Sequence, residues 1–371
     1  MRRLLLVCLC SIVTLLSVWA QDPQYSQFYA NPLYLSPAFA GSALAPRVGV
    51  NYRNQWPALD ATFVTYSASF DYYFPRVNSG VGIIINRDQQ FAKLNSTDIG
   101  AQYAYQLQLG ERVALRAGVQ LAFATRNVNF LDLNFGDQFT NDGLRSLVTT
   151  DPSLLGAGDN ISYFDFSSGG LLYSDRAWLG VSGHHLNQPR QSFLDQDSRL
   201  PIRMTVHAGY KIPLDDETRQ GLAMNVLDRE KSLSFAGLYK AQGKFDQFDV
   251  GTYLTYEPVV FGLWYRGLPI KPTELGLNNN DALIFLVGFK QEGLSLGYSY
   301  DLTISNLGTS TGGAHEISLS YEFPAPQPRR RVPRSARKLP CPGSNHSPST
   351  NPLPGPRSFR LFATAPGTNF V

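Results

Sequence analysis

The stretch HEISLSYEF, residues 315–323, decides the fold. Its apolar and polar side chains alternate strictly, and a period of two is typical of a strand with one apolar and one polar face. The proline-rich sequence that follows cannot continue a strand. A final strand that ends on an aromatic residue is typical of the strand that closes an outer-membrane β-barrel. The side chains that carry this closing-strand signal are Ile317, Leu319, Tyr321 and Phe323.

The same alternation recurs through residues 47–323. Most of the runs reach the roughly 9–11 residues that a tilted strand needs to cross a bilayer. In lipid every backbone N–H and C=O must be paired within the protein, so such a sheet has to close on itself. We therefore predict an all-β fold, a transmembrane antiparallel β-barrel; a large soluble β-sandwich, with typically shorter strands, is the alternative. The clearest apolar faces lie in residues 64–74, 99–109, 113–123, 248–256 and 294–302.

The connections between the runs alternate in length. Short turns on one side and long loops on the other are typical of outer-membrane barrels. Counting 47–53 as the first strand and 315–323 as the last gives about 14 strands, with both termini periplasmic. The segment 214–231 is too long for a short turn, and we expect a decorated periplasmic turn there. The short connections are 75–79, 110–111, 174–176, 257–258 and 292–293, and the longer ones are 54–61, 88–95, 127–160, 188–199, 268–281 and 305–314.

The composition agrees with this interpretation. Only 16% of the residues are charged, and the 19 Tyr, 23 Phe and 32 Gly favour an all-β protein over a helical one. The mean hydropathy of −0.17 excludes a polytopic helical membrane protein. It is compatible with a barrel, because only alternate residues of a barrel strand face lipid.

The sequence divides into four parts. Residues 1–20 are typical of a signal peptide, because Arg2 and Arg3 precede the apolar run 4–16, and Val18-Trp19-Ala20 forms a cleavage site before Gln21. Residues 21–46 form an aromatic, proline-rich N-terminal segment, residues 47–323 the transmembrane β-barrel, and residues 324–371 a basic, proline-rich, low-complexity tail. After cleavage only Cys341 would remain, so we expect no intrachain disulfide and no cysteine-based metal site.

The N-terminal segment should pack against something. Its prolines forbid a regular strand or helix, yet its many large apolar side chains are unsuited to water. We expect it in the barrel lumen, at the periplasmic mouth or on a partner. The predicted inward faces are small and polar, with charges of both signs such as Asp98, Arg116 and Asp301. Such a lumen is held by internal hydrogen bonds and ion pairs, or it forms a wet channel.

No motif indicates catalysis or metal binding. His184 and His185 are adjacent, and adjacent residues of a strand point to opposite faces, so we do not expect them to hold one metal ion. His207 and His315 are isolated, and the sequence has no phosphate-binding glycine loop. We therefore expect no enzyme, no catalytic residues, no metal and no cofactor.

Seven segments resemble the PorP/SprF family of Bacteroidota, outer-membrane proteins associated with type IX secretion and gliding. The resemblance runs in order from about residue 22 to residue 342. The sequence departs from the family in residues 343–371, which continue past the usual end, and in the long segment 214–231. The segments are QYSQFYANPLYLSPAFAGS (24–42), NYRNQWPAL (51–59), FVTYSASFDYYF (63–74), STDIGAQYAY (96–105), LPIRMTVHAGYKIPL (200–214), QGKFDQFDVGTYLTYEPVVFGLWYRGLPI (242–270) and GYSYDLTISNLGTSTGGAHEISLSYEF (297–323).

The resemblance implies a non-enzymatic barrel in the outer membrane of a Gram-negative bacterium. Its implied partners are outer-membrane lipid, the periplasmic ring and lipoprotein components of type IX secretion, and a large secreted protein with a C-terminal sorting domain. It implies no nucleic acid. The candidate contact surfaces are the aromatic N-terminal segment and the long loops. The candidate partner-contact residues are Tyr25, Phe28, Tyr29, Tyr34, Phe39, Trp56, Phe130, Phe135 and Phe139.

An outer-membrane pore or transporter for a small solute is the alternative function. A transporter needs a lumen that is open or can open, whereas a protein-binding barrel needs an external loop surface. The long connection 127–160 is rich in Phe, Leu and Asn. We expect it to be required for partner capture but not for folding.

Overall fold

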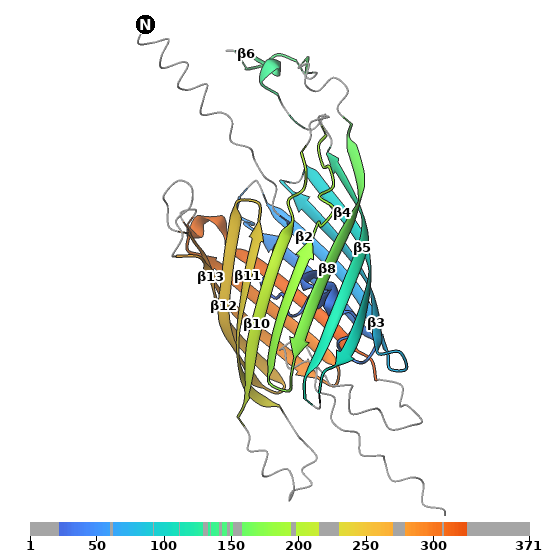
Figure 1. Ribbon diagram of the computed structural model, residues 1–371. Coiled ribbons are helices and arrows are strands. Elements are labelled where there is room, and N and C mark those ends of the chain that lie inside the picture. Colours follow the sequence, from blue (N-terminus) through green and yellow to red (C-terminus); the bar gives the residue numbers. More distant parts are fainter. Residues whose placement is uncertain are drawn as a thin grey trace, which may run out of the picture.

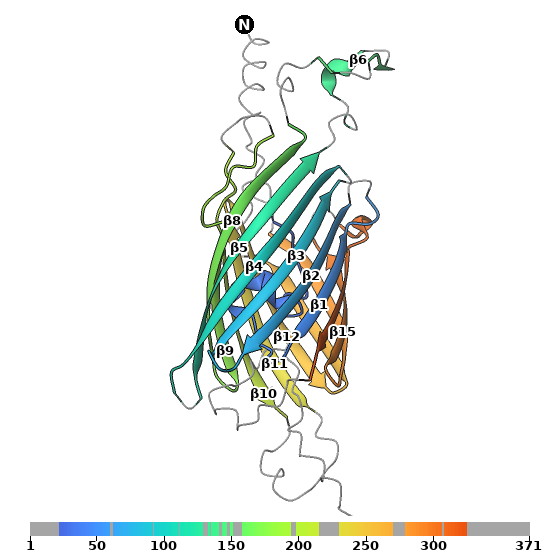
Figure 2. The ribbon, with the colours of Figure 1, turned by 90° about the vertical axis from the view of Figure 1, so that its right-hand side faces the viewer.

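Fourteen strands close into one antiparallel barrel in the computed structural model (Figures 1 and 2). The predicted all-β barrel and its strand count are therefore confirmed. The strands are β1 (Arg47–Gln55), β2 (Phe63–Phe74), β3 (Ser79–Gln90), β4 (Leu94–Gln108), β5 (Ala114–Val128), β8 (Asn160–Tyr173), β9 (Ala177–His184), β10 (Arg203–Pro213), β11 (Lys231–Gln242), β12 (Phe245–Tyr256), β13 (Val259–Gly267), β14 (Asn280–Gln291), β15 (Leu294–Thr303) and β16 (Ala314–Glu322).

The structure describes most of the chain between residues 22 and 324. Several sequence predictions lie outside the described residues: the signal peptide 1–20, nearly all of the tail 324–371, the interior of the segment 214–231, and Phe130. The described ranges are 22–59, 62–91, 93–110, 112–128, 133, 135–140, 143–146, 149–150, 158–193, 198–214, 230–269, 279–305 and 308–324.

The strands follow one another around the barrel in sequence order, and the first pairs with the last. At this seam, β1 and β16 are paired from Arg47↔Glu322 to Gln55↔Ala314. Closure leaves no unpaired sheet edge, which is the condition for a sheet to exist in lipid. The stretch that suggested a closing strand does close the barrel.

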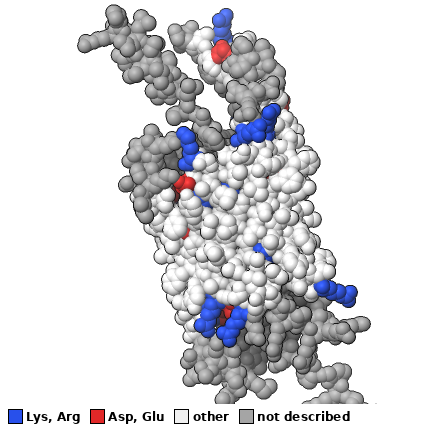
Figure 3. All heavy atoms as spheres, in the orientation of Figure 1, with Lys and Arg blue, Asp and Glu red and all other residues white. Residues whose placement is uncertain are grey.

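The alternating pattern places apolar side chains outside. The four side chains of the closing-strand signal are all exposed on the outer surface, whereas Glu316 and Glu322 on the same strand are buried inside. Charged side chains on the outer surface gather near the two ends of the barrel, and a mostly uncharged band lies between them (Figure 3). This band is what a barrel wall facing hydrocarbon requires.

Apart from 214–230 between β10 and β11, the strand connections are short at one end of the barrel, and most are longer at the other (Figure 1). The longest, between β5 and β8, carries a 3₁₀ helix, η3 (Gly136–Gln138), and a small two-stranded sheet of β6 (Phe139–Thr140) and β7 (Gly143–Leu144). Figure 1 shows β6 standing beyond the rim of the barrel. We call the two ends the short-turn end and the long-loop end.

One predicted loop is mostly strand. The sequence suggested a longer loop over 88–95, but β3 continues to Gln90 and β4 begins at Leu94, so only residues 91–93 connect them. The prediction was wrong because the polar residues of this stretch are of the types that are common in loops. Asp88 is buried inside the barrel, where a polar side chain on a strand is well accommodated.

Residues 22–46, which precede β1, lie inside the barrel, where Figure 1 shows them in blue. We call residues 22–46 the plug segment. It contains one turn of α-helix, α2 (Pro32–Leu35), and one turn of 3₁₀ helix, η1 (Pro37–Phe39). No helix among the described residues is long and apolar enough to cross a membrane.

Candidate functional site

The plug segment fills the barrel interior with aromatic side chains. Phe28 packs edge-on against Trp264 of β13, with ring centroids 4.9 Å apart. Tyr29 packs edge-on against Trp178 of β9, and the indole Nε1–H donates to the Tyr29 hydroxyl at 2.9 Å. The segment therefore contacts two strands of the wall that lie four strands apart around the barrel. Buried aromatic pairs of this geometry add to the stability that burial alone provides.

Two glycines of the wall let the plug segment approach closely. Gly118 of β5 and Gly169 of β8 face each other in register. A Cβ on Gly118 would lie 2.4 Å from the carbonyl carbon of Pro37, and a Cβ on Gly169 would lie 2.2 Å from Ser36 Oγ. Real Cβ atoms do not approach so closely. The backbone of η1 is therefore seated against a patch of wall that has no side chains.

Side chains of the wall satisfy the irregular backbone of the plug segment. Gln102 Nε2 donates to the Leu33 carbonyl at 2.8 Å, and Arg116 Nε donates to the Ala38 carbonyl at 3.0 Å. The backbone carbonyls of such a short helical segment lack most of the partners that regular structure would give them, and a buried unpaired carbonyl is unfavourable. The wall and the plug segment are thus matched in hydrogen bonding as well as in shape.

A buried ionic network ties the plug segment to the seam of the barrel. The Ser26 hydroxyl donates to Asp301 at 2.5 Å and accepts hydrogen bonds from Arg53 and Arg266, each at 2.8 Å. Both guanidinium groups also lie 2.9 Å from the Asp301 carboxylate. All four side chains are buried. Removing one partner of such a network leaves an uncompensated buried charge, which is strongly destabilising.

Glu316 of β16 extends this network to the plug backbone. Its carboxylate accepts hydrogen bonds from the backbone N–H of Ser26 at 2.7 Å and of Gln27 at 3.1 Å. Arg53 provides the counter-charge at 3.2 Å. The Gln27 side chain accepts a bond from the Ser318 hydroxyl at 2.7 Å. The segment is therefore held by the wall through its backbone as well as its side chains.

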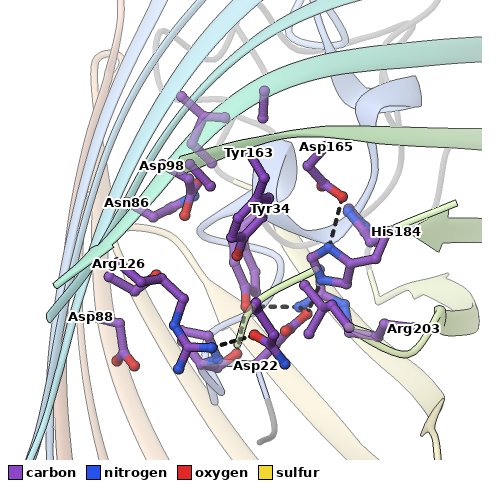
Figure 4. A pocket seen from close by; sticks show the side chains of 18 of the residues that line it. Asp22, Tyr34, Asn86, Asp88, Asp98, Arg126, Tyr163, Asp165, His184 and Arg203 are labelled. Carbon is purple, nitrogen blue, oxygen red and sulfur yellow. Dashed lines mark hydrogen bonds and ion pairs between the residues drawn. The ribbon is translucent and has the colours of Figure 1, made fainter. Parts of the chain in front are cut away.

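A second cluster holds the first described residue at the long-loop end (Figure 4). The Asp22 carboxylate lies 2.9 Å from Arg203 and 2.7 Å from His185 Nε2, and His185 Nδ1 lies 2.9 Å from Asp165. At the short-turn end, the N–H of Gly41 donates to Asp71 at 2.8 Å. The plug segment thus extends along the lumen from one end to the other.

The two ends of the plug segment lie at opposite ends of the barrel. We predicted that both termini are periplasmic, on the side of the short turns, and residues 1–21 and 325–371 lie outside the described residues. Phe323, just after the last strand, lies at the short-turn end, where its N–H donates to the Pro46 carbonyl. Asp22 lies at the long-loop end, and the plug segment runs from there along the lumen to the short-turn end, where β1 begins at Arg47 opposite Asp71.

The structure also corrects the view that His184 and His185 point to opposite faces. Strand β9 ends at His184, and His185 has a left-handed backbone conformation with φ of 59°. Alternation no longer applies past the end of the strand, so both side chains face the interior, with ring centroids 6.4 Å apart. No group of three or more His, Cys, Asp or Glu residues suited to a metal ion occurs within the described ranges.

The candidate partner-contact residues that the structure describes, all but Phe130, fall into two groups. The five in the plug segment, from Tyr25 to Phe39, lie inside the barrel and contact its wall or one another. Trp56 and Phe135 are half-buried near the long-loop end, and Phe139 is exposed. Only the second group is available at the surface in this arrangement, and partner contact stays a prediction for every residue in the set.

The longest loop has order of its own around Asp137. Its carboxylate accepts hydrogen bonds from the Thr150 N–H at 2.5 Å and from the Thr149 hydroxyl at 2.8 Å. The Thr150 N–H, first among these bonds, holds the pKa of Asp137 below its ordinary value. In the small sheet beside it, Phe139 pairs with Leu144, and both side chains are exposed. The loop thus presents an apolar pair to solvent.

The comparison with protein families decides the identity of the chain. Residues 17–321 match the family described as type IX secretion system membrane protein PorP/SprF. The chain belongs to the PorP/SprF family. Its resemblance to this family is therefore confirmed, and family and fold together indicate the outer membrane. No curated protein sequence matches this PorP/SprF chain.

Solved structures similar to this PorP/SprF chain are outer-membrane barrels and channels of low sequence identity. Omp33 of Acinetobacter baumannii is 9% identical, with 75% of this chain and 98% of that chain covered and a TM-score of 0.41. A Pseudomonas aeruginosa FadL homologue is 11% identical, with 77% and 94% covered and a TM-score of 0.40. The P. putida toluene transporter TodX is 10% identical, with 78% and 92% covered and a TM-score of 0.39. Superposition is loose, so the architecture of this chain rests on its own strand pairing.

The residues that fasten the plug segment were missed by sequence reasoning. Ser26 and Gln27 lie in the segment 24–42 and Arg203 in the segment 200–214, both of which carry the family resemblance, but no local chemical pattern marks these three residues. A usable signal was present in Asp301 and Arg116, which were predicted to face inward with charges of opposite sign. Charged residues on an inward face need partners, and the N-terminal segment was one of the expected occupants of the lumen.

Proposed function

We propose that this barrel binds protein partners of type IX secretion and helps to secrete large sorting-domain proteins or to attach them to the cell surface. The long-loop end faces the outside of the cell, where such a protein is held. The short-turn end faces the periplasm, where ring and lipoprotein components of the machinery are within reach. No catalytic step is needed for this role.

The observation that carries the proposal is the plug segment. It lies in the lumen over the full distance between the clusters at Asp22 and Gly41, and hydrogen bonds, aromatic packing and ion pairs attach it to the wall. Cavities of about 90 and 60 Å³ lie beside it. A barrel occupied by its own chain is suited to presenting its ends to partners more than to passing a solute.

The exposed pair Phe139 and Leu144 is the best candidate contact at the long-loop end. Each side chain is 49% exposed, and the pair stands beyond the rim of the barrel (Figure 1). Exposed apolar groups presented together by an ordered loop are typical of a protein-binding surface. Their position explains how a barrel with a filled lumen can hold a partner.

A crosslinked pull-down from native outer membranes tests the function. We expect the tagged wild-type barrel to recover a large secreted protein with a sorting domain, or periplasmic components of the secretion machinery. The double variant Phe139→Asp, Leu144→Asp should lose the secreted protein. The matched control is Val77→Asp, because Val77 is also exposed but lies in a short turn at the other end.

The outcomes distinguish a wrong contact surface from a wrong function. Wild-type barrel recovered alone would contradict the proposed function. Recovery of the same secreted protein by the double variant would show that the loop is not the contact surface. Equal loss in the Val77→Asp variant would mean that added charge, rather than the apolar pair, disturbs the complex.

A further inference from the structure

A polar cavity of about 90 Å³ lies in the lumen at the long-loop end, between the plug segment and the wall. Its plug side is formed by Asp22, Pro23 and Tyr34, and its wall side by residues of β3, β4, β5, β8, β9 and β10 and of the connection between β9 and β10 (Figure 4). Neither the family assignment nor the proposed partner binding uses this cavity. Its lining carries more carboxylates than the described cations around it neutralise.

The excess lies on the two adjacent strands β3 and β4. Asn86 and Asp98 are directly opposite each other in the strand pairing, and Asp88 is two positions along from Asn86 on the same face. All three side chains line the cavity. Strand alternation and pairing therefore bring two carboxylates and an amide together on one patch of the wall.

The other carboxylates of the cavity already have cationic partners. Asp22 is bound by Arg203 and by His185, and Asp165 is bound by His185. Asp98 receives one printed hydrogen bond, from Asn86 Nδ2 to its Oδ2 at 2.8 Å. Among the described residues it forms no ion pair. Arg126, the remaining guanidinium of the lining, is directed toward the side-chain oxygen of Gln191.

The Asn86 side chain points independently to a missing donor. Asn86 is 4% exposed, and its Oδ1 atom has no hydrogen-bond partner. The amide cannot simply be turned over, because its nitrogen is the group that donates to Asp98. A buried carbonyl oxygen without a hydrogen-bond donor is unfavourable, because it has lost its bonds to water and gained none. It lies beside a carboxylate that lacks a cation, so one cationic donor would satisfy both groups.

We propose that this cavity binds one organic cation, an ammonium or guanidinium group, through Asp98 and the Asn86 carbonyl, with Asp88 adding negative charge. Asp88 already accepts hydrogen bonds from Thr65 at 2.7 Å and Gln90 at 2.8 Å, which fix its carboxylate in place. A guanidinium presents several N–H donors in one plane and can bond an amide oxygen and a carboxylate at once. The source is either a free amine or a lysine or arginine side chain of another protein.

Calorimetry on the full chain in detergent micelles tests this site. The probes are ethylguanidinium, its neutral isostere ethylurea, and the capped tripeptides acetyl-Gly-Arg-Gly-amide and acetyl-Gly-citrulline-Gly-amide. We expect the cationic member of at least one pair to bind and the neutral member not to bind. Binding of ethylguanidinium alone assigns a free amine as the ligand, and binding of the arginine tripeptide assigns a basic side chain.

Charge-removing variants locate the binding. Asp98→Asn should weaken binding of the cation by about tenfold or more, since a hydrogen bond to a charged group contributes roughly 1.5–3 kcal/mol. Asp88→Asn should weaken it less. The control Asp175→Asn removes the same charge from the exposed turn between β8 and β9 at the other end of the barrel, and should leave binding unchanged. Heat-modified gel mobility verifies that each variant is folded.

Three results would overturn the proposal. They are no binding of either cation, equal binding of a cation and its neutral isostere, and unchanged binding in folded Asp98→Asn and Asp88→Asn. A titration with calcium chloride adds a fourth. Calcium binding that Asp98→Asn abolishes, without binding of either organic cation, would replace the organic cation with a metal ion.

Discussion

At the scale of single residues, Gly118 and Gly169 determine how near the plug segment comes to the wall. They are paired across β5 and β8, and the turn at Ser36 and Pro37 occupies the space where their side chains would stand. Elsewhere on the same strands, larger residues face lipid. Glycine weakens the interior of a strand. Its presence at these two positions is therefore explained by the packing of the plug segment and not by strand propensity.

This packing gives the first prediction. Gly118→Ala should lower the free energy of unfolding by about 1–3 kcal/mol, because the new Cβ overlaps the backbone of Pro37 and Ala38. Urea unfolding of the barrel in lipid vesicles, followed by tryptophan fluorescence, measures the change. Gly170→Ala is the matched control, since the nearest atom to its added Cβ is 4.0 Å away. A loss of equal size in the control would mean that the plug segment is not the cause.

At the scale of elements, the plug segment and the barrel wall form one interior. The segment has only two short helical turns, so its own backbone offers little stability. Its position depends on wall residues. Gln102 and Arg116 donate hydrogen bonds to its backbone carbonyls, and Asp301 accepts one from the Ser26 hydroxyl. Interlocking contacts of this kind, spread over both ends, indicate a segment that stays in the lumen.

Removing the plug segment should open the barrel. A variant that lacks residues 22–44 keeps every barrel strand, and we expect discrete conductance steps from it in planar lipid bilayers. The full chain should show little conductance under the same conditions. Heat-modified gel mobility and circular dichroism of the variant establish that its strands still close. If the intact chain conducts as well as the variant, the lumen is open, and transport of a small solute becomes the better function.

At the scale of the whole molecule, the face of the barrel in Figure 3 carries its charged side chains mainly near the two ends, with a mostly uncharged band between them. Leu121 lies at the middle of β5 and is exposed on this band, whereas Leu109 is exposed in a short turn at the barrel end. The two leucines differ mainly in their depth along the barrel axis. That difference allows a direct test of how the barrel sits in a membrane.

Arginine substitutions at two depths along the barrel axis test where the bilayer lies on the barrel. Leu121→Arg should lower the free energy of unfolding in vesicles by about 2–4 kcal/mol, the range for arginine at the midplane of a bilayer. Leu109→Arg should change it by roughly 0–1 kcal/mol, as expected near an interface. Equal effects at the two sites would contradict a bilayer centred on the middle of β5.

Much of this fold could be predicted because barrel strands follow a simple rule. Apolar runs such as those containing Leu121 and Leu319 carry their own period of two, and each can be read without the others. The prediction failed where the alternation stops at a strand end, and where a polar residue faces the lumen rather than solvent. Asp88 looked like a loop residue because polar lumen-facing positions resemble solvent-facing ones, and His185 lies just past a strand end.

The candidate site was less predictable, for a physical reason. The plug segment was recognised as an apolar segment that has to be buried. Three places were possible, namely the barrel lumen, the periplasmic mouth and the surface of a partner. Its contacts to Asp301 and Glu316 join residues 275 and 290 positions apart in the chain, and no local periodicity encodes such pairs. The cation-binding patch likewise requires the register of β3 with β4, which the sequence does not state.

The bonds between Ser26 and the last two strands also set an order of events during biogenesis. Residues synthesised first are held by residues synthesised last, and contacts of such long range slow folding because the chain must close a large loop before they form. Strand β1, which follows the plug segment directly, must also wait for β16 before the seam can form. Both the contacts of Ser26 and the seam depend on the last strands, so we expect the filling of the lumen and the closure of the barrel to be completed together, late in folding.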